Sequence, residues 1–270
     1  MNFLSLDIYS GKYQDFLKKI TNPKQKTLVF TPNPEIFLRA SRDVDFYTLL
    51  AKADYLTPDG NGLYIASMMQ EGRGYISACY RLFFHRKKIT KKYGELIKGS
   101  DLTRDIFEGT QKTESWKTNI MLIDQRVTLF KSEFDTRKSK IQKQAKTFLE
   151  EKYPHTMIHS IFEWDMTPDA IAHYIELQDI RYVFSTLGMK SQEQILVDIW
   201  SYLPISQRVV WLGVGSSIDY LLSLQKRAPL IVQNLWLEWL YRLILSPRKR
   251  WKRIVDAVWE FPRMIRDKNL

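Results

Sequence analysis

The chain has 270 residues, of which 44% are hydrophobic and 13% aromatic, and 41 basic against 30 acidic residues give it a formal net charge of +11. This aromatic content excludes a disordered chain, since disordered chains have too few aromatic residues to bury, and the length allows one large core or two small ones. The single cysteine, Cys79, excludes a disulfide framework and a cysteine-based zinc site and is typical of a reducing compartment.

In the first two-thirds of the chain, short β-rich runs alternate with longer stretches of helical spacing. The predicted strands are Lys26–Thr31, Asp54–Thr57, Asn119–Asp124, Thr156–Ile161, Arg181–Thr186 and Arg208–Val214. The predicted helices between them are Glu35–Ala51, Gly60–Gln70, Lys131–Lys152, Pro168–Leu177 and Gln192–Leu203. This alternation is typical of βαβ units and predicts an α/β fold with a mainly parallel sheet.

After about Ala228 the pattern changes to helices only. We predict one helix over Pro229–Leu245 and a second over Arg248–Arg266. The second helix should be bent or broken at Pro262, because proline lacks the N–H group that a helix interior needs.

Neither a signal peptide nor a membrane-spanning helix is expected. The N-terminal residues contain no charged leader before an apolar block. The longest nearly apolar stretch, Leu235–Leu245, is interrupted by Glu238 and Arg242 and is too short to span a bilayer. These features predict a soluble or peripheral intracellular globular protein.

The positive charge is concentrated in two segments. Arg73–Lys98 and Lys226–Leu270 each have a net charge of +7, and the rest of the chain has a net charge of −3. Such segments usually bind nucleic acid, an anionic membrane surface or phosphorylated ligands, although solvated lysine-rich faces give the same pattern. In the second segment the charges are interleaved with tryptophans, which favours binding of a polyanion over a merely solvated face. These tryptophans are Trp236, Trp239, Trp251 and Trp259.

Four polar or glycine-bearing loops follow predicted strands and lead into predicted helices. They are Thr31–Pro34, Thr57–Gly60, Leu187–Gln192 and Gly213–Ser217. Because parallel sheets bind their ligands at the carboxyl ends of the strands, we expect the chemistry of this protein at these loops.

Asp59 is the first candidate catalytic residue. It follows the second predicted strand and precedes Gly60, so its carboxylate should lie at a strand end near a tight turn. A carboxylate there can act as general base for a hydroxyl nucleophile if its pKa is raised toward neutrality. The alternative is an N-cap of the helix that begins near Asn61, because Asp is a favoured cap residue.

The remaining loops contain candidate substrate contacts, each with a structural alternative. These residues are Thr31, Asn33, Gln192, Glu193, Gly213 and Gly215. An Asn after a strand can hydrogen-bond a sugar or a phosphate, but Pro-Asn-Pro is also a strong turn signal. The Gln-Glu pair opens a helix whose free N–H groups suit diphosphate oxygens, or the Glu simply favours the helix dipole. The glycines let the backbone approach a phosphate, or form only a tight turn.

Other mechanisms lack the residues that they need. The four histidines (85, 155, 159 and 173) form no metal-ligand set. There is also no GxSxG nucleophile elbow and no Walker phosphate loop.

Seven short motifs follow one another in a defined order along the chain. They are Thr31-x-Asn33; Ala53-Asp54 with Asp59-Gly60; Gly99-Ser-Asp-Leu102; Gly188-x-x-x-Gln192-Glu193; Gly213-Val-Gly215 with Asp219; Lys226-Arg-Ala-Pro229; and Leu237-Glu-Trp-Leu-Tyr-Arg242 with Pro247-x-x-Arg250. Each motif alone is weak, but their order and spacing together closely resemble the WecG/TagA/CpsF glycosyltransferase family.

The resemblance implies an inverting, metal-independent transferase without a cofactor, on a modified Rossmann-like α/β fold with a helical C-terminal appendage. Family members transfer N-acetylmannosamine or a related hexose from a UDP-sugar to polyprenyl-diphosphate-linked N-acetylglucosamine, at the cytoplasmic face of the membrane. Their products serve cell-surface polysaccharide or teichoic acid synthesis. The resemblance implies a catalytic domain over residues 1–227, with a basic insertion at about 73–98, and a membrane-associating appendage over residues 228–270.

Carried over residue by residue, the resemblance makes Asp59 the base that deprotonates the acceptor hydroxyl. Thr31, Asn33 and Gln192 would position substrate. Arginines of the appendage would hold the lipid diphosphate, because the guanidinium fork matches its geometry. The candidates are Arg242, Arg250 and Arg253.

The chain departs from the family pattern in several places. Lys190 stands where a proline is common, and Leu96 stands where an arginine is expected. One of four basic residues would have to replace the charge of that arginine: Arg86, Lys87, Lys88 or Lys98. The remaining differences are Asp124-Gln125, Ser160-Ile-Phe-Glu163 and Ile218-Asp219.

Two alternatives to a transferase stay open. A non-catalytic relative would bind anionic vesicles through residues 226–270 without turning over any UDP-sugar. A nucleic-acid-binding protein would show an affinity that falls steeply with salt. Our interpretation is the transferase, with a UDP-sugar, a lipid-linked acceptor and an anionic membrane as partners and no nucleic acid; a homo-oligomer is left open.

Overall fold

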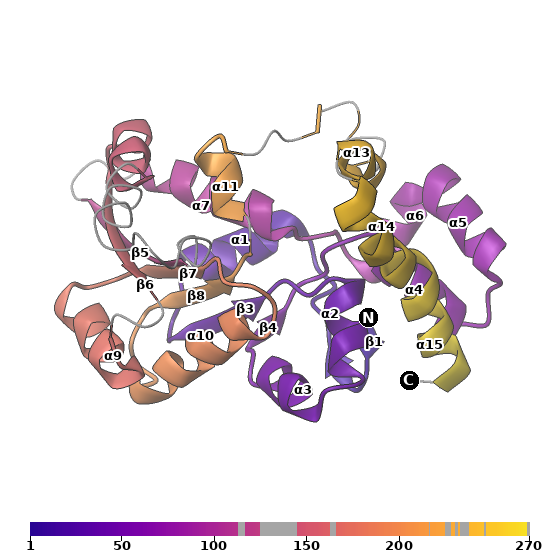
Figure 1. Cartoon of the computed structure of the whole chain (residues 1–270), viewed down its shortest axis with the longest axis horizontal. Helices are drawn as coiled ribbons and strands as arrows, with labels where there is room; N and C mark the ends of the chain where they lie inside the picture. The colour runs from indigo at the N-terminus through magenta and orange to yellow at the C-terminus, as the bar shows by residue number, and fades with distance from the viewer. Residues whose placement is uncertain are drawn as a thin grey trace.

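The computed structural model describes residues 1–112, 117–124, 145–162, 166–215, 217–224, 228, 229, 232, 238–245 and 247–268. These residues form an α/β protein, in which a parallel sheet lies between helices on both of its faces (Figure 1). The predicted fold class is therefore confirmed.

The central sheet has the strand order β4-β3-β8-β7-β5-β6, and each neighbouring pair is parallel. Its strands are β3 (Thr27–Phe30), β4 (Tyr55–Leu56), β5 (Thr118–Asp124), β6 (Thr156–Phe162), β7 (Tyr182–Ser185) and β8 (Val210–Gly213). All six coincide with predicted strands.

A small antiparallel hairpin, β1 (Asn2–Phe3) and β2 (Leu6–Asp7), precedes the sheet and was not predicted. Its turn residues Leu4 and Ser5 both have positive φ. Such turns are usually marked by Asn-Gly or Asp-Gly, and the absence of that signal explains why the sequence did not reveal the hairpin.

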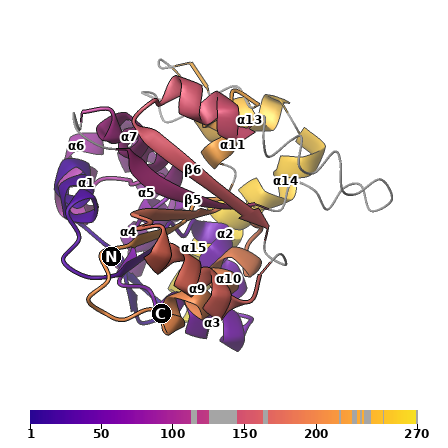
Figure 2. The same ribbon diagram turned by 90° about the vertical axis from the view of Figure 1, so that its left-hand side faces the viewer.

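Two layers of helices cover the sheet. One face is covered by α2 (Pro34–Ala40), α3 (Val44–Ala51), α9 (Pro168–Leu177) and α10 (Ser191–Tyr202). The other face is covered by α1 (Tyr13–Thr21), α7 (Gly99–Thr110), the helical residues 145–152 and α11 (Ser217–Leu221). Figure 2 shows the sheet between α9 and α10 on one side and α7 and α11 on the other.

Two of these helices differ from their predictions. The predicted helix Glu35–Ala51 is divided into α2 and α3, because Asp43 Oδ1 accepts a hydrogen bond from the N–H of Phe46 (3.0 Å) and starts a new helix. Of the predicted helix Lys131–Lys152, residues 131–144 lie outside the described residues.

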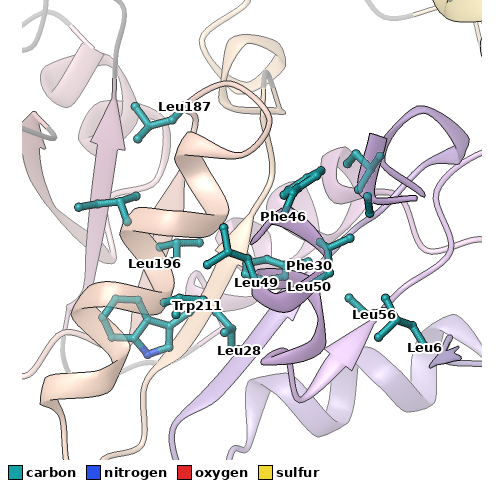
Figure 3. Close-up of a cluster of buried hydrophobic side chains, with 14 of the residues drawn as sticks. Leu6, Leu28, Phe30, Phe46, Leu49, Leu50, Leu56, Leu187, Leu196 and Trp211 are labelled. Carbon is teal, nitrogen blue, oxygen red and sulfur yellow. The ribbon is translucent and has the colours of Figure 1, made fainter. Parts of the chain in front are cut away.

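The central strands are buried on both faces. Leu28, Phe30 and Trp211 belong to the hydrophobic cluster of one face, and Val29 and Leu212 belong to that of the other. Figure 3 shows the first cluster, where side chains of the sheet meet those of α3 and α10. Strands of this kind are near-continuous apolar runs, which is why the sequence revealed them.

Beyond the β4 edge, a third cluster of buried side chains joins α4 (Gly62–Gln70), α5 (Tyr75–Phe84) and α6 (Arg86–Tyr93). The prediction of a helix ending at Gln70 is confirmed. The two following helices lie in the basic segment Arg73–Lys98 and were not predicted. α5 carries large apolar residues on both its buried and its exposed faces and so lacks one helical stripe.

The C-terminal residues form α13 (Glu238–Leu245), α14 (Pro247–Val255), the π-helical turn η1 (Asp256–Glu260) and α15 (Phe261–Lys268). The predicted second helix is distorted next to Pro262. The distortion is the π-helical turn η1, which leads directly into α15: the N–H of Phe261 donates to the carbonyl of Asp256, and the next residue, Pro262, has no N–H to continue this ladder. Of the helix predicted over Pro229–Leu245, the segment before α13 falls largely outside the described residues.

The last helix is part of the main core. Phe261 is fully buried, and its ring lies 5.2 Å from that of Phe3 and 5.9 Å from that of Phe37. α15 also packs against α2 and α4. Among the helices that the structure describes, none has the length and apolar character to span a bilayer.

Candidate functional site

The predicted site loops meet where the connections of the sheet change direction. β3 and β8 are neighbours, but β3 leads into α2 on one face and β8 leads into α11 on the other. Open α/β sheets bind their ligands at such switch points, outside the carboxyl ends of the strands. The candidate site therefore extends outward from the ends of these two strands.

Thr31, at the end of β3, joins three elements. Its Oγ1 donates a hydrogen bond to the carbonyl oxygen of Gly213 at the end of β8 (3.2 Å). A Cβ atom on Gly99, the first residue of α7, would lie 3.1 Å from Thr31 Oγ1 and 3.4 Å from Ser217 Oγ. Thr31 and Gly213 thus meet as predicted. Gly99 and Ser217 were not among the predicted site residues, although Gly99 opens one of the family motifs.

Gln192 holds the turn that follows β8. The N–H of Gly215 donates to Gln192 Oε1 (3.0 Å), and Gln192 Nε2 donates to Glu193 Oε1 (2.7 Å). Gly215 has φ +52°, a conformation that favours glycine. Both polar atoms of the Gln192 amide are therefore used within the protein, and this residue supports the site loop. Its contact with substrate stays a prediction.

Glu193 completes this series of hydrogen bonds, because it accepts on both of its carboxylate oxygens. Oε2 accepts from the N–H of Lys190 (2.7 Å), which confirms the helix-capping interpretation of Glu193. Burial raises the pKa of this carboxyl above its ordinary value, although the hydrogen bonds from Gln192 and the backbone oppose that shift. Glu193 lies between two donors and must accept on both of its oxygens. The nitrogen of the Gln192 amide therefore faces Glu193, and its oxygen faces Gly215.

Lys190 occupies a backbone conformation that proline cannot adopt. Its φ is +74°, whereas proline is held near −65°. Its ammonium group also lies 2.7 Å from Asp43 Oδ2 at the start of α3, and this hydrogen bond holds the pKa of Asp43 below its usual value. Lys190, which stands where a proline is common in the family, therefore connects α10 to α3.

The loop that carries Asp59 is attached to the β3 loop. The N–H of Asp59 donates to the carbonyl of Pro32 (3.2 Å), and buried Thr57 donates to the carbonyl of Ile97 (3.3 Å), just before α7. Gly60 has φ +107°, so the predicted tight turn is confirmed. The N-cap residue of α4 is Asn61 and not Asp59, and the half-buried Asp59 lies at the strand end as predicted.

Asn33, between two prolines, has a structural role at the start of α2. Its Oδ1 accepts from the N–H of Ile36 (3.0 Å) and caps α2. This leaves the amide nitrogen of Asn33 as its remaining donor group beside Thr31.

The C-terminal helices lie against this end of the sheet. A Cβ atom on Gly62 would lie 2.3 Å from the carbonyl oxygen of Ala257, so the η1 backbone contacts the start of α4 three residues after Asp59. Arg253, on α14, donates to Glu35 Oε2 on α2 (2.6 Å). The backbones of Arg242 and Arg250 lie on α13 and α14, and their side chains are outside the described residues.

The site is suited to anions. The N-terminus of the twelve-residue helix α7 lies beside Thr31, and Lys98 immediately precedes it. Free N–H groups and the helix dipole at such a terminus favour phosphate oxygens. Across the part of the chain that the structure describes, no three His, Cys, Asp or Glu side chains are grouped so as to hold a metal ion.

Comparisons with known proteins identify relatives of this chain. Two relatives are N-acetylglucosaminyldiphosphoundecaprenol N-acetyl-beta-D-mannosaminyltransferases. That of Bacillus subtilis (strain 168) is 26% identical over 244 residues, covering 90% of this chain and 80% of the relative. That of Staphylococcus aureus (strain MRSA252) is 25% identical over 227 residues, covering 84% and 73%. Residues 1–84 and 87–269 match a single family description, which confirms the resemblance seen in the motifs. The chain belongs to the glycosyl transferase WecG/TagA/CpsF family.

Proposed function

We propose that this protein transfers N-acetylmannosamine or a related hexose from a UDP-sugar to polyprenyl-diphosphate-linked N-acetylglucosamine. The names of the relatives support the acceptor and the sugar. The observation that carries the proposal is the meeting of the Asp59 loop with Thr31, the α7 N-terminus and the C-terminal helices at the switch point.

Asp59 is the general base of the proposed reaction. Its carboxylate takes the proton of the acceptor hydroxyl, the oxygen attacks the anomeric carbon, and UDP leaves from the opposite side with inversion. The step requires no metal if the negative charge that develops on UDP is stabilised by fixed donors.

The donor diphosphate is assigned to the N-terminus of α7 and to Lys98. Of the basic residues that could replace the family arginine, Lys98 directly precedes Gly99, which lies against Thr31. Leu96 packs instead against the buried cluster of α4 to α6. A lysine supplies charge without the bidentate geometry of arginine, so the donor site should hold the diphosphate largely through backbone N–H groups.

The other predicted residues shape the sugar site. Thr31 and Asn33 contribute the hydroxyl and amide groups beside Gly213. Gln192 and Glu193 hold the turn that ends at Gly215. The backbone of this turn is then free of a Cβ at the position where a sugar or phosphate approaches.

Residues 228–270 are proposed to complete the site that residues 1–227 provide. Arg242, Arg250 and Arg253 hold the lipid diphosphate, and Arg253 exchanges the carboxylate of Glu35 for a phosphate group of similar charge. The exposed Trp251 and Trp259 suit contact with the inner leaflet of the plasma membrane. The proposed boundary lies between residues 227 and 228, and residues 225–227 on its N-terminal side are outside the described residues.

The proposal is tested by offering a panel of UDP-sugars with a short-chain lipid-diphosphate N-acetylglucosamine acceptor and reading the product by mass. We expect an acceptor heavier by one hexose unit, with the same rate in the presence of a metal chelator. If no UDP-sugar gives a product, the proposed activity is wrong. If the chelator abolishes the product, the proposed transferase activity still stands, but the proposal that it needs no metal is wrong.

A further inference from the structure

The first basic segment, Arg73–Lys98, exposes an apolar helix face that no part of the described chain covers. On α5, Ile76 is 84% exposed, Tyr80 56%, Phe83 45% and Phe84 71%. Their spacing of four, seven and eight residues places them on one side of the helix. The opposite side, with Ala78 and Leu82, is buried in the cluster that α5 shares with α4. The exposed aromatic residues are therefore not needed to attach the helix.

The next helix, α6, exposes lysines instead. Its exposed residues are Lys87, Lys88, Lys91 and Lys92. Ile89 and Tyr93 face the buried cluster. The α5–α6 hairpin therefore presents an aromatic face followed by a cationic one, and Lys92 also pairs with Glu71 (2.5 Å).

The hairpin is continuous with the exposed part of the C-terminal helices. Tyr75, at the start of α5, contacts Trp259 of η1 with ring centroids 5.3 Å apart. Trp259 is 52% exposed and Trp251 is 63% exposed. Figure 1 shows α5 and α6 at the same end of the molecule as α13 and α14, the end opposite β6.

The chemistry of this face fits a lipid surface better than a second copy or a nucleic acid. Aromatic and aliphatic side chains flanked by lysines are typical of helices that lie in the interface of an anionic bilayer. A twofold contact between two copies would bring their lysine faces together, and like charges oppose such a contact. The most exposed of the four side chains, Ile76, is aliphatic, which suits a hydrocarbon environment and not base stacking.

We propose that the α5–α6 hairpin docks on an anionic phospholipid leaflet and forms a second lipid contact of the protein. This goes beyond the proposed function, which assigns lipid contact to residues 228–270 alone. The aromatic face of α5 enters the headgroup region and the lysines of α6 pair with lipid phosphates. With two separate contacts, the protein is held in one orientation on the membrane.

The test measures co-sedimentation of the full chain with vesicles of phosphatidylglycerol and phosphatidylcholine in equal parts. One variant carries Phe83→Ser and Phe84→Ser, and a second carries Lys87→Glu and Lys88→Glu. We expect partitioning at least about tenfold weaker in both variants, because the first loses aromatic side chains that enter the headgroup region and the second reverses charges that attract anionic lipids. Vesicles of phosphatidylcholine alone should bind the wild type more weakly than the anionic vesicles.

Matched controls change the same residue types elsewhere. Leu177→Ser with Ile205→Ser removes side chains that are 64% and 65% exposed, and Lys18→Glu with Lys24→Glu changes exposed lysines of the N-terminal part. We expect vesicle binding within about twofold of the wild type for the first pair. Charge reversal at the second pair should weaken binding less than reversal on α6, because these lysines do not approach the leaflet.

Two results would overturn the proposal. One is vesicle binding by the α5 and α6 variants that equals that of the wild type. The other is a concentration-dependent dimer, seen by sedimentation velocity without lipid, that the same substitutions abolish while vesicle binding persists. Transfer to a short-chain acceptor separates this inference from the proposed function: the α5 and α6 variants should keep the wild-type rate, and a wild type that binds vesicles without any transfer would refute the function alone.

Discussion

The two basic segments carry the same net charge of +7 but are built in opposite ways. The C-terminal helices bury aromatic and aliphatic side chains, Phe261 and Ile265, in the main core. The segment Arg73–Lys98 forms its own small cluster on α4 and leaves the outer face of α5 exposed. Two segments of equal charge therefore pack differently: one is part of the main core, and the other forms a separate cluster.

The difference teaches that packing, and not charge, decides which segment can act in catalysis. η1 contacts Gly62 and so reaches the Asp59 loop directly. α5 packs mainly against α4 and α6, and its Tyr75 contacts Trp259. We accordingly propose that both segments contact the membrane and that only the C-terminal helices also act in the active site.

The largest expected effect contrasts a buried ring with an exposed one. Phe261→Ala should lower the free energy of unfolding by about 3–5 kcal/mol, because it leaves a cavity beside Phe3 and Phe37. Phe84→Ala should change it by less than about 0.5 kcal/mol, because Phe84 is 71% exposed. Urea unfolding of both variants measures the contrast, and similar losses would show that the segments are not built differently.

A smaller effect is expected where η1 meets α4. Gly62→Ala places a methyl group against the Ala257 carbonyl, so η1 must shift at a cost of about 1–3 kcal/mol. Transfer to a short-chain acceptor should fall, while the vesicle contact of the α5–α6 hairpin stays. Gly109→Ala is the control, since nothing lies within 4 Å of the added Cβ. An unchanged transfer rate in Gly62→Ala would contradict the assignment of η1 to the site.

The smallest effect concerns the site loop itself. Glu193→Gln replaces an acceptor that faces two donors, so one hydrogen bond must be lost, at about 1 kcal/mol or somewhat more. Transfer should fall severalfold without any change in vesicle binding. Protonation of Glu193 has the same consequence, so the wild-type rate should decline on acidification through the raised pKa of this carboxyl, and the variant should lack this step. A pH profile that is the same for both proteins would refute the role of the hydrogen bonds that Glu193 accepts.

Much of the fold was predictable because its strands are short apolar runs between polar loops. Buried runs such as Thr27–Phe30 and Val210–Gly213 stand out in the sequence, and parallel topology places the following loops at one edge. The meeting of Thr31 with Gly213 follows from this logic.

Other features depend on packing that a sequence does not express. The direction of the Gln192 amide is set by Gly215 and Glu193, which come from two elements. The contact of Gly62 with Ala257 joins residues far apart in the chain. α5 was missed because its exposed face is as apolar as its buried one, which removes the helical stripe that periodicity detects.

The central claim is that Asp59 acts as the base of a sugar transfer at this switch point. The most direct test compares the rates of transfer from the active UDP-sugar to a short-chain acceptor for the wild type, Asp59→Asn and the control Asp45→Asn, which changes an exposed carboxylate on α3. We expect Asp59→Asn to be slower by about 10²–10⁴-fold with unchanged folding, and Asp45→Asn to match the wild type. A rate for Asp59→Asn equal to that of the wild type would contradict the account.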